Sequence, residues 1–71
     1  MNAIERFCEI CADEGISAAL ISDVGKNEGL AALGQACRWN AEKAQRQGEQ
    51  DRATRLRSAA QYLDYLALPY D

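Results

Sequence analysis

Three cysteines are the residues of this chain with the clearest potential for chemistry. Cys8 and Cys11 have the C-x-x-C spacing that supplies zinc ligands or a redox pair in other proteins. A zinc site needs four ligands, and the sequence adds only Cys37 and no histidine. Cys8 and Cys11 also share the apolar stripe of a predicted helix with Ile4 and Phe7, where free cysteine packs as a small hydrophobic side chain. We therefore favour structural packing over a metal or redox site, and we expect neither metal nor cofactor.

The remaining polar side chains give little support for catalysis. A nucleophile needs a base within hydrogen-bond reach, and no base is identifiable near Ser17, Ser22 or Ser58. Carboxylates one helical turn apart are explained more simply as solvated helix charges. The glycines between residues 25 and 34 lack the spacing and the lysine of a phosphate-binding loop. The sequence therefore predicts a protein that is not an enzyme.

The elements that would position these side chains are helical. Ala, Leu, Glu, Gln and Arg dominate the chain, and almost no β-branched residue follows Val24. We expect a single all-α domain over residues 1–71, a bundle of three to four helices. Residues 1–25 are expected to form acidic N-terminal helices. Residues 27–68 are expected to form an antiparallel helical hairpin, because short connections join antiparallel neighbours.

Capping residues and glycines set the expected helix boundaries. The first helix begins after Asn2, with Glu5 returning the hydrogen bond as in a capping box. Glycine tolerates the left-handed backbone that follows many helices, and proline cannot continue a helix. The other expected starts are Ser17, Asn27 and Asp51, and the expected ends are Gly15, Gly25, Gly48 and Pro69.

The expected core is thin. The apolar residues include 13 Ala and only 12 Ile, Leu or Val, and so short a chain buries only about 60% of its unfolded surface. We therefore expect a homodimer, or a protein stabilised by its partner. The expected hairpin stripes are Leu30, Leu33, Cys37, Ala41 and Ala44 on one helix, and Leu56, Ala60, Leu63 and Ala67 on the other.

Several aromatic side chains lie off these stripes. At about 100° per residue, Trp39 falls nearly opposite the stripe of its helix. Either the N-terminal helices cover it, or it meets another chain, where Trp is often a buried anchor. Tyr65 points away from the stripe of the last helix, and Tyr62 and Leu66 lie on its flank. These four residues are the candidate protein-binding site, although tyrosines can also simply border a core.

Charged side chains are distributed unevenly along the chain. The net charge is −3, yet residues 38–57 hold six basic and three acidic side chains, whereas residues 1–29 hold six acidic and two basic ones. A salt-bridged, solvated surface is the default reading of the basic group. The alternatives are contact with an acidic protein surface or with nucleic acid phosphates. The candidate electrostatic contacts are Lys43, Arg46, Arg52 and Arg55.

These patterns favour a small protein-binding module, an adaptor or inhibitor that occupies a surface on a larger protein. An odd number of cysteines, no secretory leader and no membrane-spanning run point to the cytoplasm. Phages and mobile elements use chains of this size to block host machinery, and we expect such an origin on size alone. The alternative function is a dimeric nucleic-acid-associated regulator. A small assembly subunit is a third possibility.

Overall fold

The fold is all-helical in the described part of the chain. The structure, a computed structural model, describes residues 2–67, and within that range the side chains of all residues except Lys26 and Asn27. This range contains no strand and four helices: α1 (Ala3–Glu14), α2 (Ala18–Glu28), α3 (Leu30–Arg46) and α4 (Gln50–Ala67). The predicted all-α class is confirmed. Residue 68 and the helix end predicted at Pro69 lie outside the described residues.

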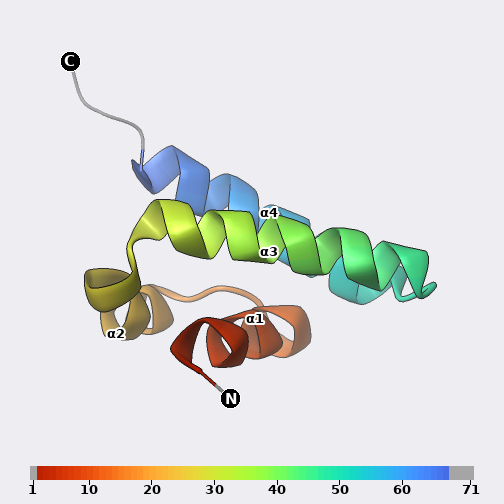
Figure 1. Cartoon of the computed structure of the whole chain (residues 1–71), viewed down its shortest axis with the longest axis horizontal. Helices are drawn as coiled ribbons and strands as arrows, with labels where there is room; N and C mark the ends of the chain where they lie inside the picture. Colours follow the sequence, from red (N-terminus) through yellow and green to blue (C-terminus); the bar gives the residue numbers. More distant parts are fainter. Residues whose placement is uncertain (1, 68–71) are drawn as a thin grey trace.

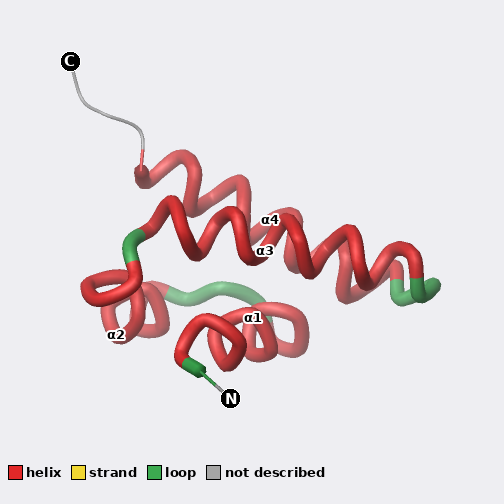
Figure 2. The backbone as a smooth tube through the Cα atoms, in the orientation of Figure 1, coloured by secondary structure: helices red, strands yellow, loops and turns green. Residues whose placement is uncertain are grey.

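Helices α3 and α4 lie side by side along the longest axis of the molecule, joined by a short turn (Figures 1 and 2). The N-terminal helices cover one side of this pair: α1 contacts both α3 and α4, and α2 contacts α1 and α3. The molecule measures 38 × 27 × 16 Å, with a radius of gyration of 11.4 Å. About 11 Å is expected for a compact chain of this length. The bundle is compact but thin, so it holds one narrow core.

The helix caps predicted for the N-terminal half are present in the structure. The Glu5 backbone N–H donates to the Asn2 side-chain oxygen at 2.8 Å, and Asn2 Nδ2 donates back to Glu5 Oε1 at 3.1 Å. Gly15 ends α1 with φ of 91°, and its N–H donates to the Cys11 carbonyl. The Leu20 N–H donates to Ser17 Oγ at 3.2 Å at the start of α2. These contacts confirm the helix starts predicted at Asn2 and Ser17 and the helix end predicted at Gly15.

The predicted end of the second helix at Gly25 is wrong. Helix α2 continues to Glu28, and the chain turns at Gly29, which has φ of 87° and donates its N–H to the Gly25 carbonyl. Gly25 instead allows close packing, since a Cβ there would lie 3.1 Å from Leu30 Cδ2. Both glycines could have ended the helix, and the positive φ that a glycine stop requires occurs at Gly29.

Two predicted starts are wrong as well. Helix α3 begins at Leu30 instead of Asn27, because Asn27 still belongs to α2. Helix α4 begins at Gln50, so Asp51 lies in its first turn and does not cap it. The Asp51 carboxylate remains favourable there, since the first turn of a helix carries partial positive charge.

The core is one cluster formed by the faces that the apolar stripes predict. Its largest fully buried side chains are Phe7 from α1, Leu33 from α3 and Leu63 from α4. Two residues predicted to lie on the buried stripes are not fully buried. Leu30, the first residue of α3, is half-buried, and Ala67, in the last turn of α4, is exposed. The other buried members are Cys8, Cys11, Ala12, Cys37, Ala41, Ala44, Ala53, Leu56, Ala59 and Ala60.

Small and charged residues fix how α3 meets α4. Gly34 is buried against α4, and a Cβ there would lie 2.9 Å from Asp64 Oδ1 and 3.6 Å from Leu63 Cβ. Arg38 forms an ion pair with the same Asp64 across the two helices. Toward the turn, Arg57 donates to the Gln45 side-chain oxygen. These contacts set the register that places the exposed side chains described next.

Candidate functional site

Trp39 lies on the outer surface of α3. Its side chain is 74% exposed, although it is the largest in the chain. The N-terminal helices therefore do not cover it, and the core closes without it. Tyr65 on α4 is 70% exposed and Tyr62 is 46% exposed, whereas Leu66 is half-buried at the edge of the core. Three of the four candidate binding residues are thus on the surface of the single chain.

The structure does not bring Trp39 and the tyrosines into one patch. Trp39 lies five positions from Gly34, which places it about 140° around α3 from the contact with α4. Tyr65 lies two positions from the buried Leu63, about 160° around α4. Each ring therefore points away from the line along which the two helices meet. The chain presents two separate aromatic sites, one on each helix.

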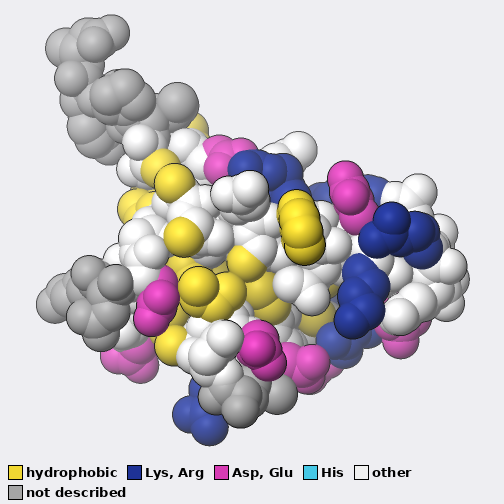
Figure 3. Space-filling view, in the orientation of Figure 1, with side chains coloured by type: hydrophobic (Ala, Val, Ile, Leu, Met, Phe, Trp, Pro, Cys, Tyr) yellow, Lys and Arg dark blue, Asp and Glu magenta, His cyan; other side chains and the backbone are white. Residues whose placement is uncertain are grey.

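Half-buried apolar side chains pack against the edge of the core. Figure 3 shows them gathered between the N-terminal helices and the start of α3. Ala36 belongs to this set and lies one turn from Trp39 on the same helix. The apolar residues of α2 are among them, because the short α2 is only partly covered by its neighbours. The half-buried members are Ile4, Ile16, Leu20, Ile21, Val24, Leu30 and Ala36.

Two of the four candidate electrostatic residues contact helix α1. Arg52 Nη1 lies 2.6 Å from Asp13 Oδ1, and Arg52 Nε lies 4.0 Å from Glu49 Oε2. Arg55 donates its Nε–H to the Ala12 carbonyl near the end of α1. That carbonyl lies in the last turn of α1, where helix carbonyls lack partners within the helix. The sequence predicted salt bridges within the basic group, but it gave no sign of the two contacts to α1.

Lys43 and Arg46 differ from these two arginines. Both are exposed in the last turn of α3, and neither forms an ion pair with any residue that the structure describes. Their charge is favoured by the partial negative charge of the helix end. Figure 3 shows basic side chains toward the α3–α4 turn on the face that also carries the apolar side chains. These two side chains remain available for an external partner.

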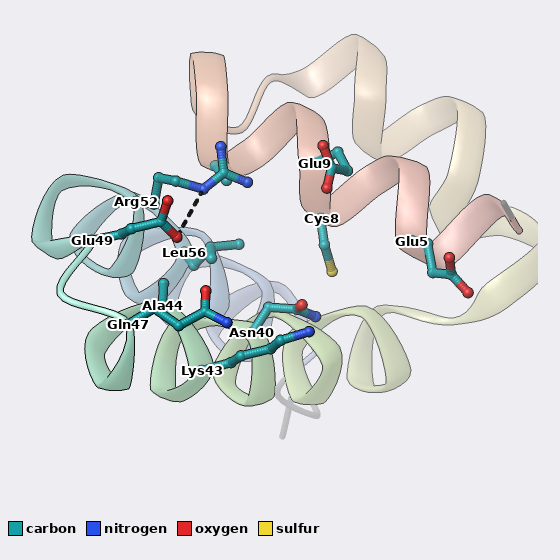
Figure 4. A pocket seen from close by; sticks show the side chains of 11 residues that line it. Glu5, Cys8, Glu9, Asn40, Lys43, Ala44, Gln47, Glu49, Arg52 and Leu56 are labelled. Carbon is teal, nitrogen blue, oxygen red and sulfur yellow. Dashed lines mark ion pairs between the residues drawn. The ribbon is translucent and has the colours of Figure 1, made fainter.

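A cleft of about 350 Å³ lies where α1 meets α3 and α4. Figure 4 shows Cys8 pointing from α1 into this space, toward Asn40 and Lys43 on α3. The lining carries charges of both signs, so the cleft favours neither anions nor cations. Its lining residues are Glu5, Cys8, Glu9, Ala12, Asn40, Lys43, Ala44, Gln47, Glu49, Arg52 and Leu56.

Of the three cysteines, only Cys8 lines this cleft, and Cys11 and Cys37 are fully buried in the core. All are free and buried, and the thiol of Cys37 interacts with those of Cys8 and Cys11. The hydrogen bond that Cys37 donates lowers the pKa of Cys11, and the pKa of Cys37 rises to about 12 through the same bond. The bond from Cys8 to Cys37, together with burial, raises the pKa of Cys8. No three His, Cys, Asp or Glu side chains among the described residues are arranged to hold a metal ion.

Comparison with known proteins gives no relative: no family model, no curated protein and no solved structure matches the chain. The described part of the chain contains no helix with the length and apolar character that a membrane crossing requires. A proposal about function must therefore begin from the surface geometry.

Replacing Arg55 with alanine should lower the free energy of unfolding by about 1–3 kcal/mol, because the carbonyl of the buried Ala12 loses a charged donor. Urea unfolding followed by circular dichroism measures this loss. Arg46→Ala is the matched control, and it should change stability by less than about 0.5 kcal/mol. Equal effects of the two substitutions would contradict the assigned role of Arg55.

Proposed function

We propose that this protein is a small, non-catalytic protein-binding module, an adaptor or inhibitor that occupies a surface on a larger protein. The observation that carries the proposal is Trp39, which is 74% exposed while the core closes without it. Tryptophan is enriched among the residues that dominate binding energy at interfaces, where a partner removes it from water. An exposed indole beside a half-buried apolar surface is suited to that role.

The α3–α4 pair would present this anchor as a rigid antiparallel hairpin. The buried Gly34 and the Arg38–Asp64 ion pair support the backbone beneath Trp39. Helix surfaces hold side chains more firmly than loops do, which lowers the ordering cost of binding. The basic residues Lys43 and Arg46 would steer the protein toward an acidic partner surface, affecting the encounter rate more than the affinity.

The second aromatic site fits self-association. Tyr62, Tyr65 and Leu66 lie on α4, away from Trp39, so a homodimer formed there leaves both Trp39 side chains available. A chain with so thin a core gains stability from the apolar surface that a dimer interface buries. We place this activity in the cytoplasm. The phage or mobile-element origin stays a prediction from chain size.

The alternative function is a dimeric nucleic-acid-associated regulator. Lys43 and Arg46 favour it, because phosphate contacts need unpaired basic groups and neither forms an ion pair within residues 2–67. However, Arg52 and Arg55 are already engaged with α1, which leaves two of the four candidate groups for phosphates. Two groups give a weaker electrostatic footprint than the alternative requires. Protein binding is therefore the better-supported proposal.

A pull-down with tagged protein tests the proposal. Extract is divided into nuclease-treated and untreated portions, and each is exposed to wild type, Trp39→Ala and Gln35→Ala. Gln35 is an exposed residue on the same helix and serves as the matched control. We expect one protein retained in stoichiometric amount after nuclease treatment, lost with Trp39→Ala and kept with Gln35→Ala. Bound material that disappears with nuclease would instead support the nucleic-acid function.

A further inference from the structure

Helix α4 has one side that no other helix covers. Within residues 2–67, α4 contacts α1 and α3 but not α2. The four charged side chains between residues 52 and 65 all turn toward these two neighbours. Arg52 and Arg55 contact α1, and Arg57 and Asp64 contact α3. The uncovered side is therefore free of charge over about three turns, in a chain in which 27% of the residues are charged.

The side chains on this uncovered side form one row, which we call the α4 stripe. Its members are all exposed and lie within about 60° of each other around the helix: Thr54, Ser58, Gln61 and Tyr65. Tyr62 borders the stripe and is 46% exposed. The centres of protein interfaces are depleted in charged residues and enriched in tyrosine. The α4 stripe has both properties.

The spacing of the α4 stripe is symmetric, but the sizes of its side chains are not. Its members follow each other at intervals of four, three and four residues, so the midpoint lies between residues 59 and 60. Thr54 and Ser58 on one half are small, whereas Gln61 and Tyr65 on the other half are large. Two copies of α4 that lie antiparallel about this midpoint therefore bring each large side chain against a small one. Parallel copies would instead set tyrosine against tyrosine and leave a gap between the small residues.

We propose that two copies of this chain form an antiparallel homodimer through the α4 stripe, with a two-fold axis between residues 59 and 60. The same surface then serves both copies, as two-fold symmetry requires. Thr54 faces Tyr65 of the partner subunit, and Ser58 faces Gln61 of the partner subunit. The hydroxyl and the amide of the second pair can each donate and accept a hydrogen bond, so these polar groups keep partners when water leaves. The dimer rests on the proposed function, because it uses the aromatic site on α4 assigned there to self-association.

Sedimentation velocity on the purified protein tests the dimer. The contact of two helices of this length is at the small end of protein interfaces, so we expect a dissociation constant on the order of 10 μM. The mass should rise from that of one chain to that of two between about 1 and 300 μM. A wild type that remains a single chain throughout this range would overturn the proposal.

A charge placed on the α4 stripe tests whether this surface forms the contact. Ser58→Arg puts two positive charges beside the two-fold axis and should weaken the dimer by at least about 30-fold, because like charges repel across an interface. Ser22→Arg, at an exposed position on α2, is the matched control and should dimerise like wild type. Circular dichroism confirms that both variants are folded. Equal dimerisation of the two variants would overturn the assignment of the interface to α4.

Cysteines introduced at exposed positions test the antiparallel orientation. A disulfide needs Cα atoms within about 7 Å of each other. A mixture of Ser58→Cys and Gln61→Cys proteins should therefore form covalent dimers on mild oxidation. Thr54→Cys should not link to its own copy, because the two positions lie about 16 Å apart along the antiparallel helices. If Thr54→Cys links as fast as the mixture, the helices are parallel and the proposal is wrong.

The dimer and the binding of a larger protein can fail separately. The sedimentation and cross-linking measurements use purified protein alone, so a monomeric wild type overturns the dimer and leaves the role of Trp39 unaffected. Ser58→Arg should also retain the larger protein in the pull-down, because Trp39 lies on a different helix. If no protein is retained although the antiparallel dimer forms, the proposed function fails and the dimer stands.

Discussion

Replacing Phe7 with alanine is expected to lower the free energy of unfolding by about 3–5 kcal/mol. Phe7 is fully buried and is the largest such side chain in the core. Most of the other buried core residues are alanines and cysteines, which are too small to fill the space that it would leave. Domains have only about 0.05–0.15 kcal/mol of stability per residue, so this loss removes much of the total. Thermal and urea unfolding by circular dichroism measure it.

The matched control is Phe7→Leu, which keeps most of the volume and should cost less than about 1.5 kcal/mol. The difference between the two substitutions isolates the cavity at the contact of α1 with the α3–α4 pair. An alanine variant with the wild-type urea midpoint would show that α1 does not contribute to the core as the structure places it.

Replacing Trp39 with alanine is expected to leave stability almost unchanged and to weaken partner binding strongly. Stability should change by less than about 0.5 kcal/mol, because the side chain is 74% exposed and supports no part of the core. Affinity for the partner should fall by at least about 30-fold, the equivalent of roughly 2 kcal/mol for an anchor residue. Titration of the purified partner with each variant measures this change.

Gln35→Ala on the same helix should bind like wild type, since it removes little contact area. A Trp39→Ala variant that bound as well as Gln35→Ala would exclude Trp39 as the anchor. A large loss of stability in Trp39→Ala would point to a different role, in which the ring packs within an assembly of copies of this chain.

Local sequence signals predicted the parts of the fold that depend on neighbouring residues. The Asn2 cap and the Ser17 cap each rest on a hydrogen bond that spans three residues. The apolar stripe that contains Phe7 correctly predicted the buried face of α1, because helical periodicity determines which side chains share a face. In contrast, the choice between Gly25 and Gly29 depends on packing between α2 and α3, which local pattern does not contain.

The candidate site was predictable only in part, for the same reason. The position of Trp39 opposite its stripe followed from periodicity, but whether α1 and α2 cover it depends on where those helices dock. Arg55 looked like a free basic group because its partner, the Ala12 carbonyl, lies 43 residues away in the chain. The meeting of Cys37 with the α1 cysteines likewise requires two helices to pack in one register.

Trp39 itself provides the most direct measurement, because it is the only tryptophan in the chain. The free protein should emit as a solvent-exposed indole and should be quenched readily by acrylamide. When the partner retained by the pull-down is added, we expect the emission to shift to shorter wavelength and the quenching to fall. If emission and quenching stay unchanged while the complex forms, binding occurs through another surface and Trp39 is not the anchor.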